Sequence, residues 1–146
     1  MTLKDIEKQI NATKSHLEKA LIHLEYSLSK IEKISKDYDI EDFEILETFE
    51  SFTSRFSRVS DIMAKKLVRS LVLRDDPSFS GGLMDFLNQG EKLAFISDAN
   101  HWWVIRSLRN KEAHEYTEED LRGYFSTIKT ESIYVIDETR ALLKKL

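Results

Sequence analysis

The sequence predicts an all-α protein, an antiparallel up-and-down bundle of four to five helices. Apolar residues recur at helical spacing through most of the chain, which has 146 residues. Only four glycines and one proline interrupt it, so turns are few. No segment shows the alternation of apolar and polar residues that is typical of a half-buried strand. The length fits one domain with its own core, so we expect residues 1–146 to form a single helical domain.

The first expected helix covers residues 3–35 and carries a narrow apolar seam. Five residues recur every seven positions along this seam: Leu3, Ile10, Leu17, Leu24 and Ile31. Thr2 and Asp5 have the spacing of a capping box. Such a seam is typical of an antiparallel bundle or a helix–helix interface. His16 and His23 lie beside it, but no third metal ligand is visible, so both are expected on the surface.

A second helix is expected from Glu41 to Arg74, with Asp39 as a plausible cap. Its apolar face, most simply core, comprises Phe43, Leu46, Phe49, Phe52, Phe56, Val59, Met63, Leu67 and Leu71. Basic residues lie on a neighbouring face: Arg55, Arg58, Lys65, Lys66 and Arg69. Two interpretations stay open for these cations, a solvated charged face or a flank that binds RNA phosphates.

A loop at 75–82 contains the only proline and two of the glycines. A short helix at 83–95 is expected to follow it. Gly90 weakens that helix locally, because glycine has a low helix propensity.

The next helix begins at a cap formed by Ser97-Asp98. Its apolar positions, Trp102, Ile105 and Leu108, are expected to be buried. Trp103 lies on a different face, where it is available to another helix or a partner chain. His101 is expected on the surface. Thr117 then begins the last helix, which runs to the end of the chain.

Composition limits the possible functions. The formal net charge is −4, so the molecule as a whole does not attract nucleic acid, and any binding must come from a local basic patch. The chain has no cysteine, which excludes disulfides and thiolate zinc sites. Neither a signal-peptide pattern nor a membrane-spanning run is present. We therefore expect a cytoplasmic protein without membrane or DNA partners.

The candidate site lies between Ile105 and Tyr116, where four chemically capable residues occupy little more than two helical turns. These are Arg109, Asn110, His114 and Tyr116. Asn110 and His114 are four apart and share a helix face. Arg109 and His114 are separated by about 140° around the axis and about 7.5 Å along it, a gap that an arginine can bridge. Near a helix C-terminus the dipole favours a protonated imidazole.

This set of residues suits phosphate chemistry on RNA. Arginine binds a phosphate with two parallel donors and stabilises the charge of the transition state, while histidine transfers protons. The RNA 2′-hydroxyl is an internal nucleophile, so we expect neither a metal nor another cofactor. Taken singly, each residue is more commonly a cap or a solvated charge. At average residue frequencies, the combined pattern has a probability on the order of 10⁻³ in a chain of this length.

Arg109-Asn110-x3-His114-x-Tyr116 resembles the RX4HXY signature of the HEPN superfamily, in particular of HepT-type toxins. Two further stretches, 55–58 and 87–93, together with 102–116, are similar to a HEPN subgroup found beside minimal nucleotidyltransferases. The resemblance covers roughly residues 40–125, with the hexapeptide core as its specific part.

The resemblance implies a homodimeric, metal-independent endoribonuclease that is the toxin of a toxin–antitoxin pair. His114 would act as general acid or base, Arg109 would bind the scissile phosphate, and Asn110 would orient the phosphate or the imidazole. A partner nucleotidyltransferase, the antitoxin, would AMPylate Tyr116. Alternatively, Tyr116 is a structural hydroxyl that supports His114.

Two other functions remain open. The chain could be a non-catalytic nucleotidyltransferase-binding subunit, either substrate-binding or antitoxin-like, which its acidic balance favours slightly. It could also be a plain helical dimerisation domain in which the motif is accidental. The low chance probability of the motif makes this last interpretation the weakest.

Overall fold

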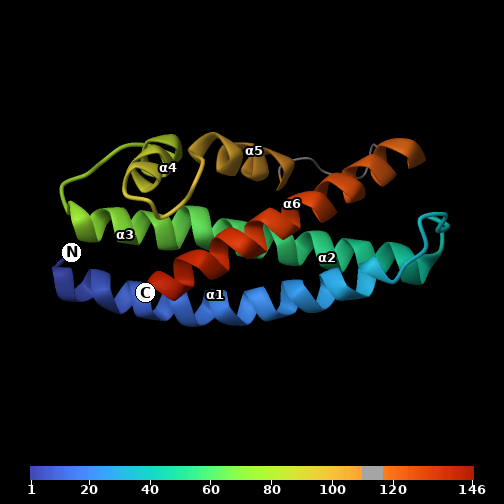
Figure 1. Cartoon of the computed structure of the whole chain (residues 1–146), viewed down its shortest axis with the longest axis horizontal. Helices are drawn as coiled ribbons and strands as arrows, with labels where there is room; N and C mark the ends of the chain where they lie inside the picture. The colour runs from blue at the N-terminus through green and yellow to red at the C-terminus, as the bar shows by residue number, and fades with distance from the viewer. Residues whose placement is uncertain (110–116) are drawn as a thin grey trace.

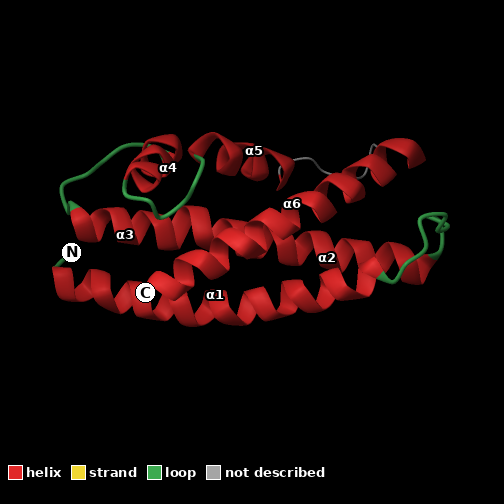
Figure 2. Cartoon of the chain, viewed as in Figure 1, coloured by secondary structure: helices red, strands yellow, loops and turns green. Residues whose placement is uncertain are grey.

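The computed structural model describes residues 1–109 and 117–146, and all regular structure within them is helical (Figure 2). The elements are α1 (Leu3–Glu32), α2 (Phe43–Asp61), the π-helical η1 (Ile62–Leu67), α3 (Val68–Asp75), α4 (Leu83–Lys92), α5 (Ala99–Arg109) and α6 (Glu118–Lys145). The predicted all-α class is confirmed. None of the described helices combines the length and the apolar character needed to cross a membrane.

The helices form a bundle around a long antiparallel pair (Figure 1). One member of the pair is α1, and the other is the continuous rod of α2, η1 and α3. Helix α6 crosses this pair obliquely and contacts both α1 and α2. The two short helices, α4 and α5, lie over the rod, where α4 contacts α3 and η1 and α5 contacts α2.

Helix α1 begins as predicted. Asp5 N donates to Thr2 Oγ1 at 3.1 Å and Thr2 N donates to the Asp5 carboxylate at 3.1 Å, which completes the capping box. The seam is buried at Ile10, Leu17, Leu24 and Ile31. Leu3 departs from the prediction, because it is the first residue of the helix and is 57% exposed at the end of the bundle.

The second helix begins later than predicted. Asp42, not Asp39, is the N-cap, and its Oδ1 accepts from Glu44 N at 3.0 Å and Ile45 N at 3.1 Å. The Asp39 carboxylate accepts from Glu41 N within the preceding turn. Phe43 is the first helical residue, where the rod has only begun, so its ring is 87% exposed instead of buried.

A π-helical segment interrupts this otherwise α-helical rod. Val68 N donates to Met63 O, the i to i−5 bond of a π-helix. The segment buries Met63, Ala64 and Leu67, while Lys65 and Lys66 stay exposed. Short π-segments inside α-helices occur frequently at functional sites.

Helix α4 is shorter than predicted because it ends in a Schellman motif. Phe95 N donates to Gly90 O and Ala94 N donates to Glu91 O. Ala94 adopts a φ of 63°, in the left-handed region, and therefore cannot continue the helix. Gly90 has a role that its low propensity did not predict. A Cβ at this position would lie 2.6 Å from Val68 Cγ1, so glycine permits the close packing of α4 on α3.

Gly90→Ala is expected to lower the free energy of unfolding by about 1–3 kcal/mol, because the added methyl group overpacks the contact with Val68. Urea denaturation of both proteins measures the difference. Gly123→Ala is the matched control, since its added Cβ in α6 meets no atom of the described residues within 4 Å apart from its chain neighbours and its own helix backbone. The control should gain up to about 1 kcal/mol from helix propensity. Equal stability of the two variants would contradict the close packing of α4 on α3.

Candidate functional site

The predicted motif joins α5 to α6. Arg109 is the last residue of α5, and its side chain lies outside what the structure describes. Asn110, His114 and Tyr116 lie outside the described residues. Thr117 is the N-cap of α6 as predicted, with its hydroxyl accepting from Asp120 N at 3.2 Å. The described structure therefore informs the site through the two helices that flank the motif.

Helix α5 is anchored firmly at its N-terminus. Asp98 caps it as predicted, since its Oδ1 accepts from His101 N at 3.1 Å. Ala99 N donates to Glu91 Oε1 of α4 at 2.8 Å. Of the apolar residues predicted to be buried, Trp102 and Ile105 are each 1% exposed. Leu108 is half-buried and packs against the core.

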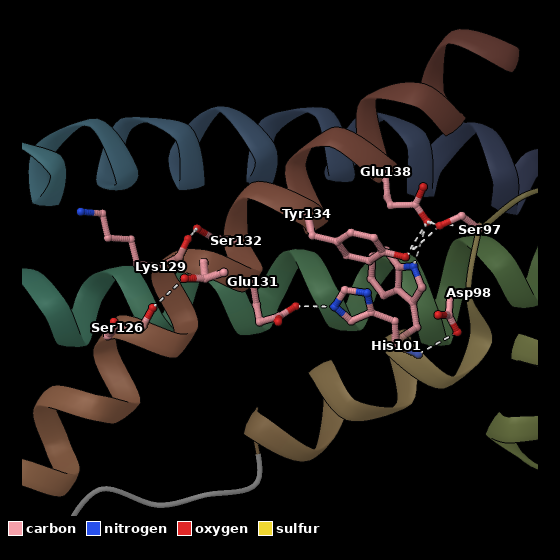
Figure 3. A network of polar contacts seen from close by, with 11 residues as sticks. Ser97, Asp98, His101, Ser126, Lys129, Glu131, Ser132, Tyr134 and Glu138 are labelled. Atoms are coloured by element: carbon pink, nitrogen blue, oxygen red, sulfur yellow. Dashed lines mark hydrogen bonds and ion pairs between the residues drawn. The ribbon is translucent and has the colours of Figure 1, made fainter.

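His101 is not the surface residue that the sequence predicts. Its Nε2 lies 2.5 Å from Glu131 Oε2 on α6, and its side chain is 30% exposed. The imidazole stacks on the ring of Tyr134, with 3.7 Å between ring centroids and 24° between planes (Figure 3). Both partners lie about 30 residues along the chain, on one face of α6, so local sequence gives little sign of them.

One carboxylate oxygen of Glu138 accepts four hydrogen bonds. Its Oε1 accepts from Ser97 N and Ser97 Oγ at 2.9 Å each, from Tyr134 Oη at 3.1 Å and from Trp102 Nε1 at 3.3 Å. Burial alone would raise the pKa of Glu138, but the hydrogen bonds from Ser97, Trp102 and Tyr134 outweigh it and hold the pKa below its ordinary value. Burial raises the pKa of Tyr134 to about 12, aided by the neighbouring Glu138 charge and opposed by the Ser97 hydrogen bond.

These side chains form a single cluster, which we call the α5–α6 clamp: Ser97, His101, Trp102, Glu131, Tyr134 and Glu138. It joins two helices whose backbones make little close contact. Its polar groups bind one another, so the clamp fixes the direction in which α5 leads into the motif. Sequence reasoning missed it, although the i, i+3, i+7 spacing of Glu131, Tyr134 and Glu138 marks one helix face.

Arg55 makes structural contacts with α1. Its Nη1 donates to Ser27 Oγ at 2.7 Å and to His23 O at 3.3 Å, and its guanidinium lies 6.0 Å from the centre of the Tyr26 ring. These contacts tie α2 to α1. Arg55 is thus not a freely solvated charge, whereas Arg58 is exposed.

Over residues 1–109 and 117–146, no three His, Asp or Glu side chains come together in a way that could hold a metal ion. The described structure thus defines an all-helical protein in which a polar clamp joins the two helices that flank the motif. Comparison of the chain with protein-family models, curated proteins and solved structures found no match.

Proposed function

We propose that this chain is a HEPN-type endoribonuclease that cleaves RNA without a metal ion and is the toxin of a toxin–antitoxin pair. The observation that carries the proposal is the motif Arg109-Asn110-x3-His114-x-Tyr116 at the junction between α5 and α6. The described part of helix α5 runs to Arg109, and the clamp holds this helix near its N-terminus. A helix fixed against its neighbour suits a site that must position a phosphate.

In the proposed reaction, the 2′-hydroxyl oxygen attacks the adjacent phosphorus and the bond to the 5′-oxygen breaks. One imidazole accepts the 2′-hydroxyl proton, and a second imidazole donates a proton to the leaving 5′-oxygen. Arg109 stabilises the negative charge that builds on the phosphoryl oxygens, and Asn110 orients the phosphate or the imidazole. The products carry a 2′,3′-cyclic phosphate and a 5′-hydroxyl.

The need for two imidazoles calls for a homodimer, and the exposed face of α5 supports one. Trp103 and Val104 are 40% and 52% exposed on this face, although both are apolar. Asn110 and His114 follow Trp103 and Ser107 by seven residues, so they would share this face if the helical spacing expected from the sequence extends through the motif. Two-fold pairing through α5 would bring two motifs together and cover Trp103.

Regulation by a nucleotidyltransferase antitoxin completes the proposal. Transfer of AMP from ATP to the Tyr116 hydroxyl, with release of pyrophosphate, would place a phosphodiester charge and an adenosine within the motif. The added negative charge would compete with RNA phosphates for Arg109 and block cleavage.

A second candidate function is a non-catalytic subunit that binds the nucleotidyltransferase. The formal net charge of −4 favours it, because an acidic surface repels RNA. The motif would then bind a nucleotide phosphate without cleaving any bond.

The test is cleavage of total RNA in EDTA by protein expressed without the nucleotidyltransferase, after mass spectrometry has verified that Tyr116 is unmodified. The proposal expects fragments with 2′,3′-cyclic phosphate ends. Intact RNA after incubation with folded, dimeric and unmodified protein would reject the nuclease and leave the binding subunit. Co-expression with the nucleotidyltransferase should add the mass of AMP to Tyr116 and stop cleavage.

A further inference from the structure

Two hollows lie on either side of the π-helical segment and share two basic residues. The first, of about 500 Å³, lies between α1 and the rod, and Lys65, Lys66 and Arg69 line it. The second, of about 290 Å³, lies between the rod, the start of α4 and α5, and it is lined by Lys65, Arg69 and Arg106. Lys65 and Arg69 line both hollows, and we call the two adjoining hollows together the cation groove.

Charge in the cation groove is opposite in sign to that of the chain. The sequence has 26 acidic residues, yet none of the side chains that line either hollow is acidic. Lys65 lies 3.9 Å from Asp61, at the outer limit of an ion pair. Within the described part of the chain, Lys66, Arg69 and Arg106 have no carboxylate partner. Asp85, at the rim, uses its carboxylate to accept from Gly82 N at 2.8 Å.

Arg106 gives an independent indication that the groove takes an anion. Its Nε is buried and has no hydrogen-bond partner among the residues that the structure describes. A buried cationic N–H without an acceptor costs free energy, which an anionic oxygen in the adjoining hollow would offset. Two aromatic rings hold the guanidinium groups in place. Arg106 lies 5.4 Å from the centre of the Trp103 ring, and Arg69 lies 4.9 Å from that of Phe86.

We propose that the cation groove binds the phosphodiester backbone of single-stranded RNA. Its two adjoining hollows carry four cations between them, which suits a chain of successive phosphates. Arg106 precedes Arg109 by three residues on α5, about 4.5 Å along the helix axis, so the hollow lined by Arg106 lies near the first residue of the motif. The inference rests on the proposed function only in taking RNA as the ligand.

The test measures RNA binding as a function of salt. A fluorescent 2′-O-methyl single-stranded RNA is used, because it lacks the nucleophile for cleavage, and the full-length wild-type chain is titrated by anisotropy. Each phosphate contact contributes about −0.7 to the slope of log K against log salt concentration. Lys65→Gln combined with Lys66→Gln should therefore flatten the slope by about 1.4 and weaken binding.

Lys30→Gln combined with Lys33→Gln is the matched control. These two lysines lie at the C-terminal end of α1, outside the groove, and the change in net charge is the same. Circular dichroism establishes that both double variants are folded. Arg106→Gln is a second test, at the other hollow of the groove. It should flatten the slope of log K against log salt concentration by about 0.7.

An unchanged slope in the Lys65/Lys66 variant, or a change no larger than in the control, would overturn the proposal. ATP and inorganic phosphate are tested as ligands in two further titrations. If the Lys65/Lys66 variant weakens the binding of ATP but not that of RNA, the ligand is a nucleotide and the RNA proposal fails. RNA binding that depends on the groove cations, without any cleavage, would reject the nuclease function and support the groove proposal. Cleavage that does not depend on the groove cations would support the nuclease function and reject the groove proposal.

Discussion

His114→Ala is expected to slow metal-free RNA cleavage by at least a factor of about 10²–10⁴, the usual contribution of a single positioned acid or base. The proposed dimer uses one imidazole to accept the 2′-hydroxyl proton and another to protonate the leaving oxygen. The substitution removes both at once. Arg109 would remain to bind the phosphate, so RNA affinity should change much less than the rate. Single-turnover cleavage of a labelled RNA separates the two effects.

His23→Ala is the control for this prediction, because His23 is an exposed histidine on α1 that is remote in sequence from the motif. It should cleave at the wild-type rate. His101→Ala tests the clamp separately. That imidazole pairs with Glu131 and serves in positioning, so its loss should lower stability and rate together. Full activity in His114→Ala would remove His114 from the mechanism and favour the binding-subunit function.

The helices could be predicted because their signal is local. The seam of α1 at Ile10, Leu17 and Leu24 recurs with helical periodicity and is buried. The residues at which helices begin and end depend on individual capping hydrogen bonds. The sequence predicts Asp39 as the cap of α2, whereas the hydrogen bonds select Asp42. The role of Gly90 depends on the position of Val68, which no local pattern encodes.

The candidate site was predictable only as a motif. Arg109, Asn110 and His114 stand out by composition and spacing, and this is a property of the sequence alone. The clamp could not be found in this way, because His101 meets Glu131 only when α6 crosses beside α5. The contacts of Arg55 with α1 likewise depend on tertiary packing. The sequence alone therefore does not distinguish Arg55 from the exposed Arg58.

Glu138→Ala is expected to lower the free energy of unfolding by about 2–3 kcal/mol at neutral pH, because the substitution leaves several donors without their charged acceptor. These donors are the Ser97 N–H, the Ser97 and Tyr134 hydroxyls and the Trp102 indole N–H. Asp137→Ala, at the neighbouring exposed carboxylate, should change stability by no more than about 0.5 kcal/mol. Urea denaturation of wild-type protein and both variants gives the comparison.

The destabilisation caused by Glu138→Ala should depend on pH. The pKa of Glu138 is lowered in the folded protein, since burial, which opposes ionisation, is outweighed by the hydrogen bonds to the carboxylate. The unfolded chain therefore binds the proton more readily, and the stabilisation is present above the ordinary glutamate pKa and lost as pH falls through the folded-state value. The difference between wild type and Glu138→Ala should be smaller at about pH 3 than at neutral pH. A difference that is constant over this range would mean that the charge of Glu138 does not hold α5 against α6.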